Sequence, residues 1–116
     1  MEIQTKTVDD VMVVSLTGEI NGRNAPDVQE QLLPLAQPGS RLLLNMSGVS
    51  YMSSAGLRTL LMLYRQIDRQ GGCVALSNLQ EMIQDMMSVT GFLDFFTAYA
   101  TEGEGIQALK ECEKHG

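Results

Sequence analysis

Apolar residues along the chain switch repeatedly between the spacing of a strand and that of a helix. The strand-like stretches are 2–8, 11–17, 41–46, 73–76 and a short piece within 95–100. Asp9 and Asp10 separate the first two stretches and predict a hairpin turn. Residues 41–46 form a nearly unbroken apolar run, which is typical of a strand covered on both faces.

Helical spacing fills the segments between these strands. Signals for a helix start lie at four places: Asn24, Ser54, Asn78 and the capping box Thr101–Glu104. The clearest helix spans about 54–70, where apolar residues recur every three or four positions. In this pattern Arg58, Thr59 and Met62 fall on the polar side, and Gly71 with Gly72 ends the helix.

The resulting order, β-β-α-β-α-β-α-β-α, predicts one α/β domain over residues 1–116. We expect a mixed, mainly parallel sheet with an N-terminal hairpin and about four helices. Two loops, 18–23 and 47–53, are expected after neighbouring strands. Because ligands and partners of parallel sheets meet loops at the carboxyl ends of strands, these loops predict the functional edge.

Two adjacent serines, Ser53 and Ser54, lie where the second loop meets the long helix. Serine is a preferred helix N-cap, and a capping serine most often has no further role. Gly56 is unusual in a first helical turn, because glycine weakens a helix by roughly 1 kcal/mol relative to alanine. The small residues after the serine pair leave a hydroxyl open to a large partner.

Composition narrows the function classes. The net charge is −6, and the eight Lys and Arg residues are scattered, so nucleic acid and membrane surfaces are unsuitable partners. The chain has no long apolar run and no layout of a signal peptide. Cys73 and Cys112 do not form the pattern of a disulfide framework. We therefore expect a reduced, cytoplasmic protein.

Catalysis is not expected from these residues. A serine nucleophile needs a base, and the only histidine is His115, beside the C-terminal residue. The Gly-x-Ser-x-Gly elbow and a phosphate-binding loop with its lysine are both absent from the sequence. His and Cys residues do not cluster, so no metal site and no cofactor are predicted.

The run LLNMSGVSYMSSAGL at 43–57 resembles the signature of the STAS domain, as found in bacterial anti-sigma factor antagonists. A second run, LTGEIN at 16–21, resembles another signature of that family. The glycines at 71–72 and the helix ending near 90–92 also fit, so the resemblance covers nearly the whole chain.

The resemblance implies a phosphorylation switch. Ser54 maps to the serine that an anti-sigma kinase of the histidine-kinase-like ATPase fold phosphorylates, with Ser53 as second choice. Unphosphorylated protein would bind the kinase, phosphorylation would release it, and a phosphatase would restore binding. The implied partner surface comprises Asn21, Arg23, Asn24, Ser53, Ser54, Gly56, Arg58 and Met62.

Two positions depart from the family pattern, because Ser53 and Asn21 stand where acids are common. Both departures remove negative charge beside Ser54, which lowers the repulsion of a phosphate. The alternative that the resemblance leaves open is a STAS scaffold, or a regulatory module that binds a nucleotide or a lipid, without a sigma factor client.

Overall fold

A five-stranded mixed sheet organises the computed structural model, which describes residues 1–112. Its strands are β1 (Glu2–Val8), β2 (Val11–Ile20), β3 (Arg41–Met52), β4 (Cys73–Ser77) and β5 (Thr97–Tyr99). Its helices are α1 (Ala25–Leu32), α2 (Ser54–Arg69), α3 (Glu81–Val89) and α4 (Glu102–Lys110), with 3-10 turns η1 (Leu33–Leu35) and η2 (Phe92–Asp94). The strands lie side by side in chain order, and only β1 runs antiparallel to its neighbour. The predicted order of elements and the mixed sheet are confirmed.

The N-terminal hairpin turns through Asp9 and Asp10, as predicted. Both residues have positive φ, 49° and 68°, and Val8 pairs with Val11. Two central residues of positive φ make the turn whose twist matches that of the flanking strands. This tight turn fixes the register of β1 on β2.

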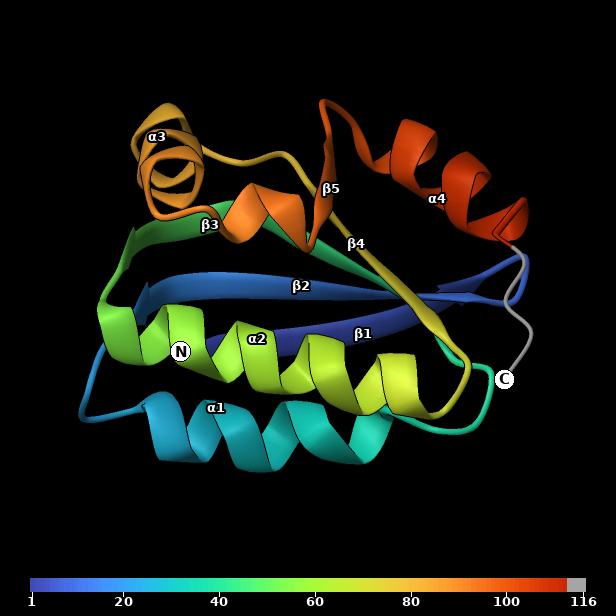
Figure 1. Ribbon diagram of the computed structural model, residues 1–116, viewed down its shortest axis with the longest axis horizontal. Helices are drawn as coiled ribbons and strands as arrows, with labels where there is room; N and C mark the ends of the chain where they lie inside the picture. The colour runs from blue at the N-terminus through green and yellow to red at the C-terminus, as the bar shows by residue number, and fades with distance from the viewer. Residues whose placement is uncertain (113–116) are drawn as a thin grey trace.

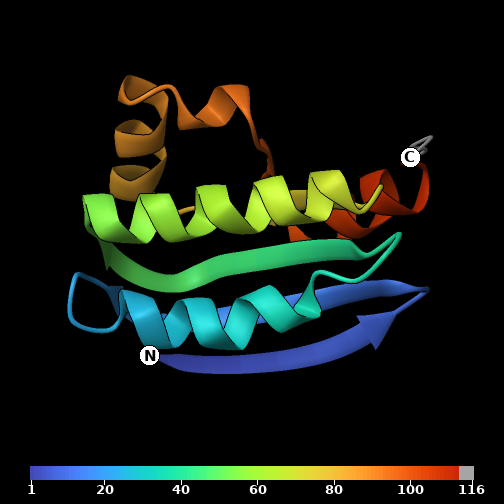
Figure 2. The same cartoon turned by 60° about the horizontal axis from the view of Figure 1, so that its bottom comes forward.

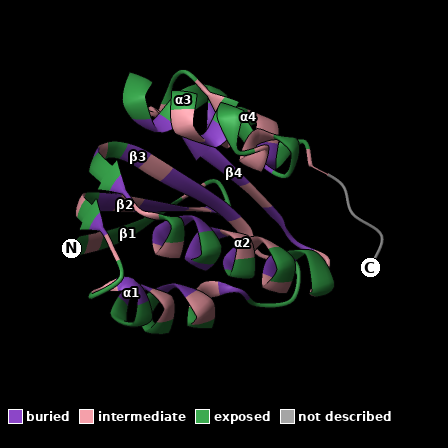
Figure 3. Cartoon of the chain, turned by 60° about the vertical axis from the view of Figure 1, so that its left-hand side comes forward, coloured by how far each residue is buried: buried purple, intermediate pink, exposed green. Residues whose placement is uncertain are grey.

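Helices cover both faces of the sheet unequally (Figures 1 and 2). α1, α2 and α3 pack on one face over the larger core, which contains Leu44, Leu60 and Met87. α4 covers part of the other face, where Leu109 packs with Val13 and Leu43. The first halves of β2 and β3 and most of β4 are therefore buried, whereas the ends of β2 and β3 carry exposed residues (Figure 3).

The strand β3 is twice as long as predicted. It runs to Met52, and β2 runs to Ile20, so most of the expected loops 47–53 and 18–23 are strand. The pairing of β2 with β3 shifts register twice, between Ser15 and Thr17 and between Gly18 and Glu19. Such bulges bend a strand without ending it. Because each bulge interrupts the two-residue alternation of buried and exposed positions, the sequence pattern did not reveal the second half of β3.

Three details of the helices differ from the sequence prediction. α3 begins after Gln80, not after Asn78, which adopts φ 58° outside the helix. Thr59 is buried, with 3% of its surface exposed, rather than on the polar side of α2. The Thr101 hydroxyl accepts a hydrogen bond from the amide of Glu104, so the predicted cap of α4 is confirmed. No helix within residues 1–112 combines the length and apolar character that a membrane crossing needs.

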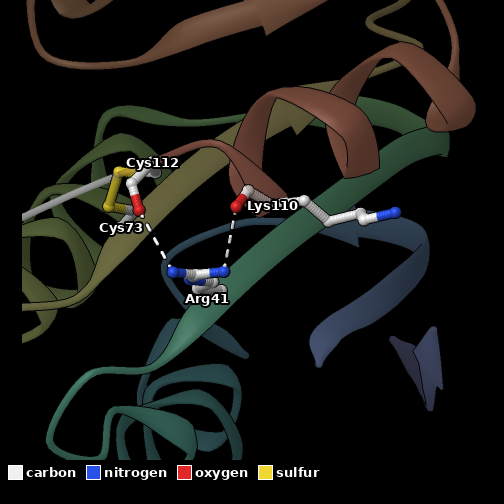
Figure 4. Close-up of a disulfide and its surroundings, with 4 residues drawn as sticks. All are labelled: Arg41, Cys73, Lys110 and Cys112. Carbon is white, nitrogen blue, oxygen red and sulfur yellow. Dashed lines mark hydrogen bonds between the residues drawn. A yellow bond between two sulfur atoms is a disulfide. The ribbon is translucent and has the colours of Figure 1, made fainter. Parts of the chain in front are cut away.

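The prediction for the cysteines was wrong. Cys73, at the start of β4, and Cys112, just after α4, form a disulfide across 39 residues of sequence (Figure 4). Because α4 folds back over the start of β4, residues distant in sequence become neighbours. The expectation of a protein with two free thiols is therefore corrected.

Candidate functional site

The junction between β3 and α2 positions the two serines differently. The amide of Ser53 donates a hydrogen bond to the carbonyl of Ile20 at 2.8 Å, which extends the contact between β2 and β3. The Ser53 hydroxyl accepts from the amide of Gly56 at 3.4 Å, and its backbone is extended. Ser53 is therefore the N-cap of α2.

Ser54 is the first residue of α2, and its side chain is exposed. Within residues 1–112, its hydroxyl has no hydrogen-bond partner. The hydroxyl stands at the positive end of the helix dipole, where unpaired amides favour negative charge. A modifying group attached there would disturb no contact of the fold.

Close packing explains the glycine in the first turn of α2. A Cβ atom added to Gly56 would lie 2.6 Å from Cγ of Met52 and 2.9 Å from Cγ2 of Ile20. Gly56 therefore lets the helix start approach the ends of β2 and β3. It is buried beneath the serine pair, so it sets the position of the exposed hydroxyl through the backbone.

The turn from β2 to α1 lies beside the serine pair, because Ile20 bonds to Ser53. The Oδ1 atom of Asn21 accepts from the amides of Arg23 and Asn24, at 2.9 and 3.2 Å. In return, the Asn24 side chain accepts from the amide of Asn21 and donates to the carbonyl of Glu19. Asn24 stands at the N-cap position of α1, as predicted, but its side chain holds this turn instead of capping the helix.

A shallow groove of about 230 Å³ runs between α1 and α2 next to Ser54. It is lined by Gly22, Ala25, Pro26 and Gln29 on one side and by Ala55, Arg58, Thr59 and Met62 on the other. Arg58 is exposed, and Met62 keeps 39% of its surface exposed. The groove thus offers a cation and an adaptable apolar side chain within two turns of Ser54.

Most of the predicted partner surface comes together at this end of the sheet. Asn21, Arg23, Asn24, Ser53 and Ser54 form its corner, and Arg58 and Met62 continue it along α2. The sequence prediction missed Tyr51, which is 47% exposed and lies opposite Glu19 in the register. A sequence analysis that recognised the bulges would have identified Tyr51, because the bulges decide which face of β3 each residue takes.

The side chains that commonly bind metal ions do not cluster among the residues that the structure describes. In the described part of the chain, no three His, Cys, Asp or Glu residues could hold a metal ion together. His115 lies outside the described residues.

Comparison with known proteins assigns the family. The STAS domain family model matches residues 2–105. The anti-sigma-B factor antagonist of Bacillus subtilis is 32% identical over 107 residues, which span 92% of this chain and 98% of that protein. The anti-sigma-B factor antagonist of Staphylococcus epidermidis is 27% identical over 108 residues, with 92% and 98% covered.

Solved structures share the fold. An anti-sigma factor antagonist from Mycobacterium paratuberculosis superposes with a TM-score of 0.82 at 23% identity, covering 95% of this chain and 94% of that one. The unphosphorylated anti-sigma factor antagonist SpoIIAA superposes with a TM-score of 0.77 at 19% identity, covering 96% and 98%. This chain belongs to the STAS domain family, among relatives that are anti-sigma factor antagonists.

Proposed function

We propose that this protein is an anti-sigma factor antagonist in a partner-switching circuit. In its unphosphorylated form it binds an anti-sigma serine kinase of the histidine-kinase-like ATPase fold. Phosphorylation of Ser54 breaks that complex, and a phosphoserine phosphatase restores binding. The observation that carries the proposal is the exposed Ser54 hydroxyl, which is free of hydrogen bonds at the first position of α2.

The position of Ser54 suits a switch that acts on a partner and not on the fold. A phosphate adds nearly two negative charges and three strong acceptors. At a helix start the dipole and the free amides stabilise that charge, so α2 stays folded. The added charge and bulk then change only the surface that a kinase meets. The related SpoIIAA is known in both an unphosphorylated and a phosphorylated form.

The geometry favours Ser54 over Ser53 as the acceptor. The Ser53 hydroxyl is half-buried and caps α2 through the amide of Gly56. Its modification would remove that cap and force a charged group toward the packed end of β2. Ser54 has neither constraint, so a kinase can reach its hydroxyl without unfolding the first turn.

One of the two departures from the family pattern, Asn21, fits this arrangement. Asn21 supplies the acceptor oxygen that its turn needs, through its bonds to the amides of Arg23 and Asn24. A carboxylate would accept the same bonds but would add negative charge beside the modified serine. The substitution thus keeps the turn and lowers the repulsion that phosphoserine 54 would experience.

The remaining surface of the partner site is the groove between α1 and α2 together with the corner residues. Arg58 can pair with an acid of the kinase, and Met62 can adapt to an apolar contact. The protein supplies the substrate serine and the docking surface, while the kinase supplies ATP and the catalytic groups. We place this circuit in the cytoplasm.

The test combines phosphorylation with binding. The protein is incubated with its cognate kinase and ATP, and the phosphate is mapped by mass spectrometry. We expect modification at Ser54 in the wild type and in Ser53→Ala, and no modification in Ser54→Ala. Ser54→Glu should lose kinase binding by about a hundredfold, because one buried or crowded charge costs several kcal/mol at an interface.

Ser50→Glu provides the matched control, since Ser50 is an exposed serine of β3 outside the corner. It should bind the kinase like the wild type. A phosphate found only at other positions, or a complex insensitive to Ser54→Glu, would contradict the switch. The second of these results would favour the scaffold or ligand-binding alternative.

A further inference from the structure

The disulfide between Cys73 and Cys112 lies at the end of the molecule opposite Ser54. Cys73 pairs with Arg41 at the start of β3, whereas Ser54 follows the end of that strand. Figure 1 shows α2 starting at one end of the sheet and β4 starting at the other. The disulfide is thus separate from the proposed kinase surface.

Contacts other than the disulfide hold Cys112 in place. The Arg41 guanidinium donates to the carbonyl of Lys110 at 3.1 Å and to that of Cys112 at 3.2 Å (Figure 4). Leu109 is buried against the sheet, and the Lys110 ammonium lies 3.4 Å from Asp9. These contacts hold the backbone at the end of α4 against the sheet independently of the bond between the two sulfur atoms.

A pocket gives small molecules access to the bond. It has a volume of about 210 Å³ and is lined by both cysteines together with Tyr64, Gly72 and Phe95 among others. Cys73 is buried, with 8% of its surface exposed, while Cys112 is only half-buried. Cys112 is therefore the more exposed of the two residues, which makes its sulfur the expected point of attack.

We propose that Cys73 and Cys112 form a reversible thiol–disulfide site that exchanges with low-molecular-weight thiols. A thiolate attacks the Cys112 sulfur, the bond to Cys73 breaks, and the Cys73 thiolate leaves and takes up a proton. A second thiolate then attacks the small-molecule sulfur of the mixed disulfide and releases Cys112 as a thiolate, which also takes up a proton. In sum, the protein gains two electrons and two protons, and two thiols become one small disulfide.

The site controls how firmly the end of α4 is held on the sheet. Disulfides in thiol-rich compartments are commonly transient or sense redox state. In the oxidised form the bond ties the end of α4 to β4, and in the reduced form only the contacts of Arg41, Leu109 and Lys110 remain. The Arg41 bonds keep the reduced pair preorganised, so the bond can form again.

Equilibration in glutathione buffers tests the proposal. The full chain is incubated without oxygen at graded ratios of reduced to oxidised glutathione, then quenched with acid, alkylated and weighed by mass spectrometry. At each ratio, the same oxidised fraction should be reached from the fully reduced protein and from the fully oxidised protein. In Cys73→Ser the glutathione adduct should form on Cys112 about tenfold faster than it forms on Cys73 in Cys112→Ser, because access governs the rate.

The Arg41 bonds are tested in the same buffers. Arg41→Ala should lower the equilibrium constant for disulfide formation by about tenfold, because two charge-assisted hydrogen bonds no longer hold Cys112 near Cys73. Arg65→Ala, at an exposed site on α2, should leave the constant unchanged. Hydrogen exchange should become faster in residues 106–111 on reduction and stay constant in residues 54–60.

Three results would overturn the proposal: reduction that oxidised glutathione cannot reverse, an Arg41→Ala constant equal to that of the wild type, or unchanged exchange in α4. Circular dichroism of each variant verifies that it is folded. These outcomes do not depend on the kinase, so they are independent of the function proposed for Ser54.

Discussion

Ser53 and Ser54 have the same type of side chain but differ in role, because α2 starts between them. The Ser53 hydroxyl faces back to the amide of Gly56 and closes the helix start. The Ser54 hydroxyl points to solvent from the first helical position. One serine is thereby committed to structure, and the other remains free for chemistry.

This division predicts unequal costs of removing each hydroxyl. Ser53→Ala should lower the free energy of unfolding by about 1 kcal/mol, because the amide of Gly56 loses its cap. Ser54→Ala should change it by less than about 0.5 kcal/mol, since its hydroxyl has no partner among residues 1–112. Urea unfolding followed by circular dichroism measures both, and equal losses would contradict the assignment of the cap.

Gly56 provides a second prediction at this scale. Gly56→Ala should destabilise the protein by about 1–3 kcal/mol, although alanine favours helices, because its Cβ would overlap Met52 and Ile20. Gly103→Ala is the matched control in α4, where nothing lies within 4 Å of an added Cβ. It should stabilise the protein by up to about 1 kcal/mol in the same urea titration. A stabilising Gly56→Ala would show that the helix start can shift freely.

At the scale of elements, the bulged strand β3 determines where the corner with Ser53 and Ser54 lies. Its core-facing residues Met46, Val49 and Met52 are three apart instead of two. Each bulge inserts one residue and restores the inward face. Gly48 permits the close approach, because a Cβ there would lie 2.8 Å from the carbonyl oxygen of Leu16. The strand therefore reaches Met52 in the orientation that presents Ser53 and Ser54.

The start of α4 is attached to the sheet by a polar cluster. The Glu102 carboxylate lies 2.9 Å from the Lys6 ammonium. It also accepts a hydrogen bond from the side-chain amide of Asn45 at 3.0 Å. The bonds from Lys6 and then from Asn45 hold the pKa of Glu102 below its ordinary value, against the opposing effect of burial. The cluster connects β1, β3 and α4 through one side chain.

This lowered pKa predicts a pH dependence. The unfolded chain takes up the Glu102 proton near its ordinary pKa of about 4.3, at a higher pH than the folded protein does. The contribution of Glu102 to stability is therefore complete above that pKa and is lost as the pH falls through the lower, folded value. Urea titrations between about pH 6 and pH 3 should show a smaller loss of stability in Glu102→Gln than in the wild type.

Glu104→Gln is the control for this titration, because Glu104 lies in the same helical turn and is exposed. Its pH profile should parallel that of the wild type. If Glu102→Gln also follows the wild type at every pH, the contacts of Glu102 with Lys6 and Asn45 do not stabilise the folded protein.

The whole molecule has two ends with different chemical groups. One end carries the free serine, the asparagine turn and the groove between α1 and α2. The other end carries the disulfide, which closes a loop of 39 residues. The twelve residues of β3 separate the two ends.

The disulfide should contribute to global stability. The chain-entropy relation gives about 4 kcal/mol for a loop of this length, because the bond restricts the unfolded chain. Cys112→Ser should therefore unfold at a lower urea concentration than the oxidised wild type. The wild type that is reduced and kept in reductant throughout the titration should match the variant. Identical midpoints for oxidised and reduced protein would show that the bond does not constrain the unfolded state.

The sequence alone determined the features that depend on neighbouring residues. The hairpin at Asp9-Asp10, the cap at Thr101 and the alternation of strands and helices are local patterns, and all were confirmed. The family resemblance, carried by the runs at 16–21 and 43–57, was confirmed as well. Ser54 as the modified residue stays a prediction, with its exposed hydroxyl as support.

Only the tertiary structure decided what depends on contacts between distant segments. The bulges come from the pairing of β2 with β3, and the burial of Thr59 comes from packing inside the fold. The disulfide forms because α4 folds back over the start of β4. Residue spacing encodes the type of each element and its regular faces, whereas a bulge, and the neighbour that covers a given side chain, are fixed only when the elements pack together.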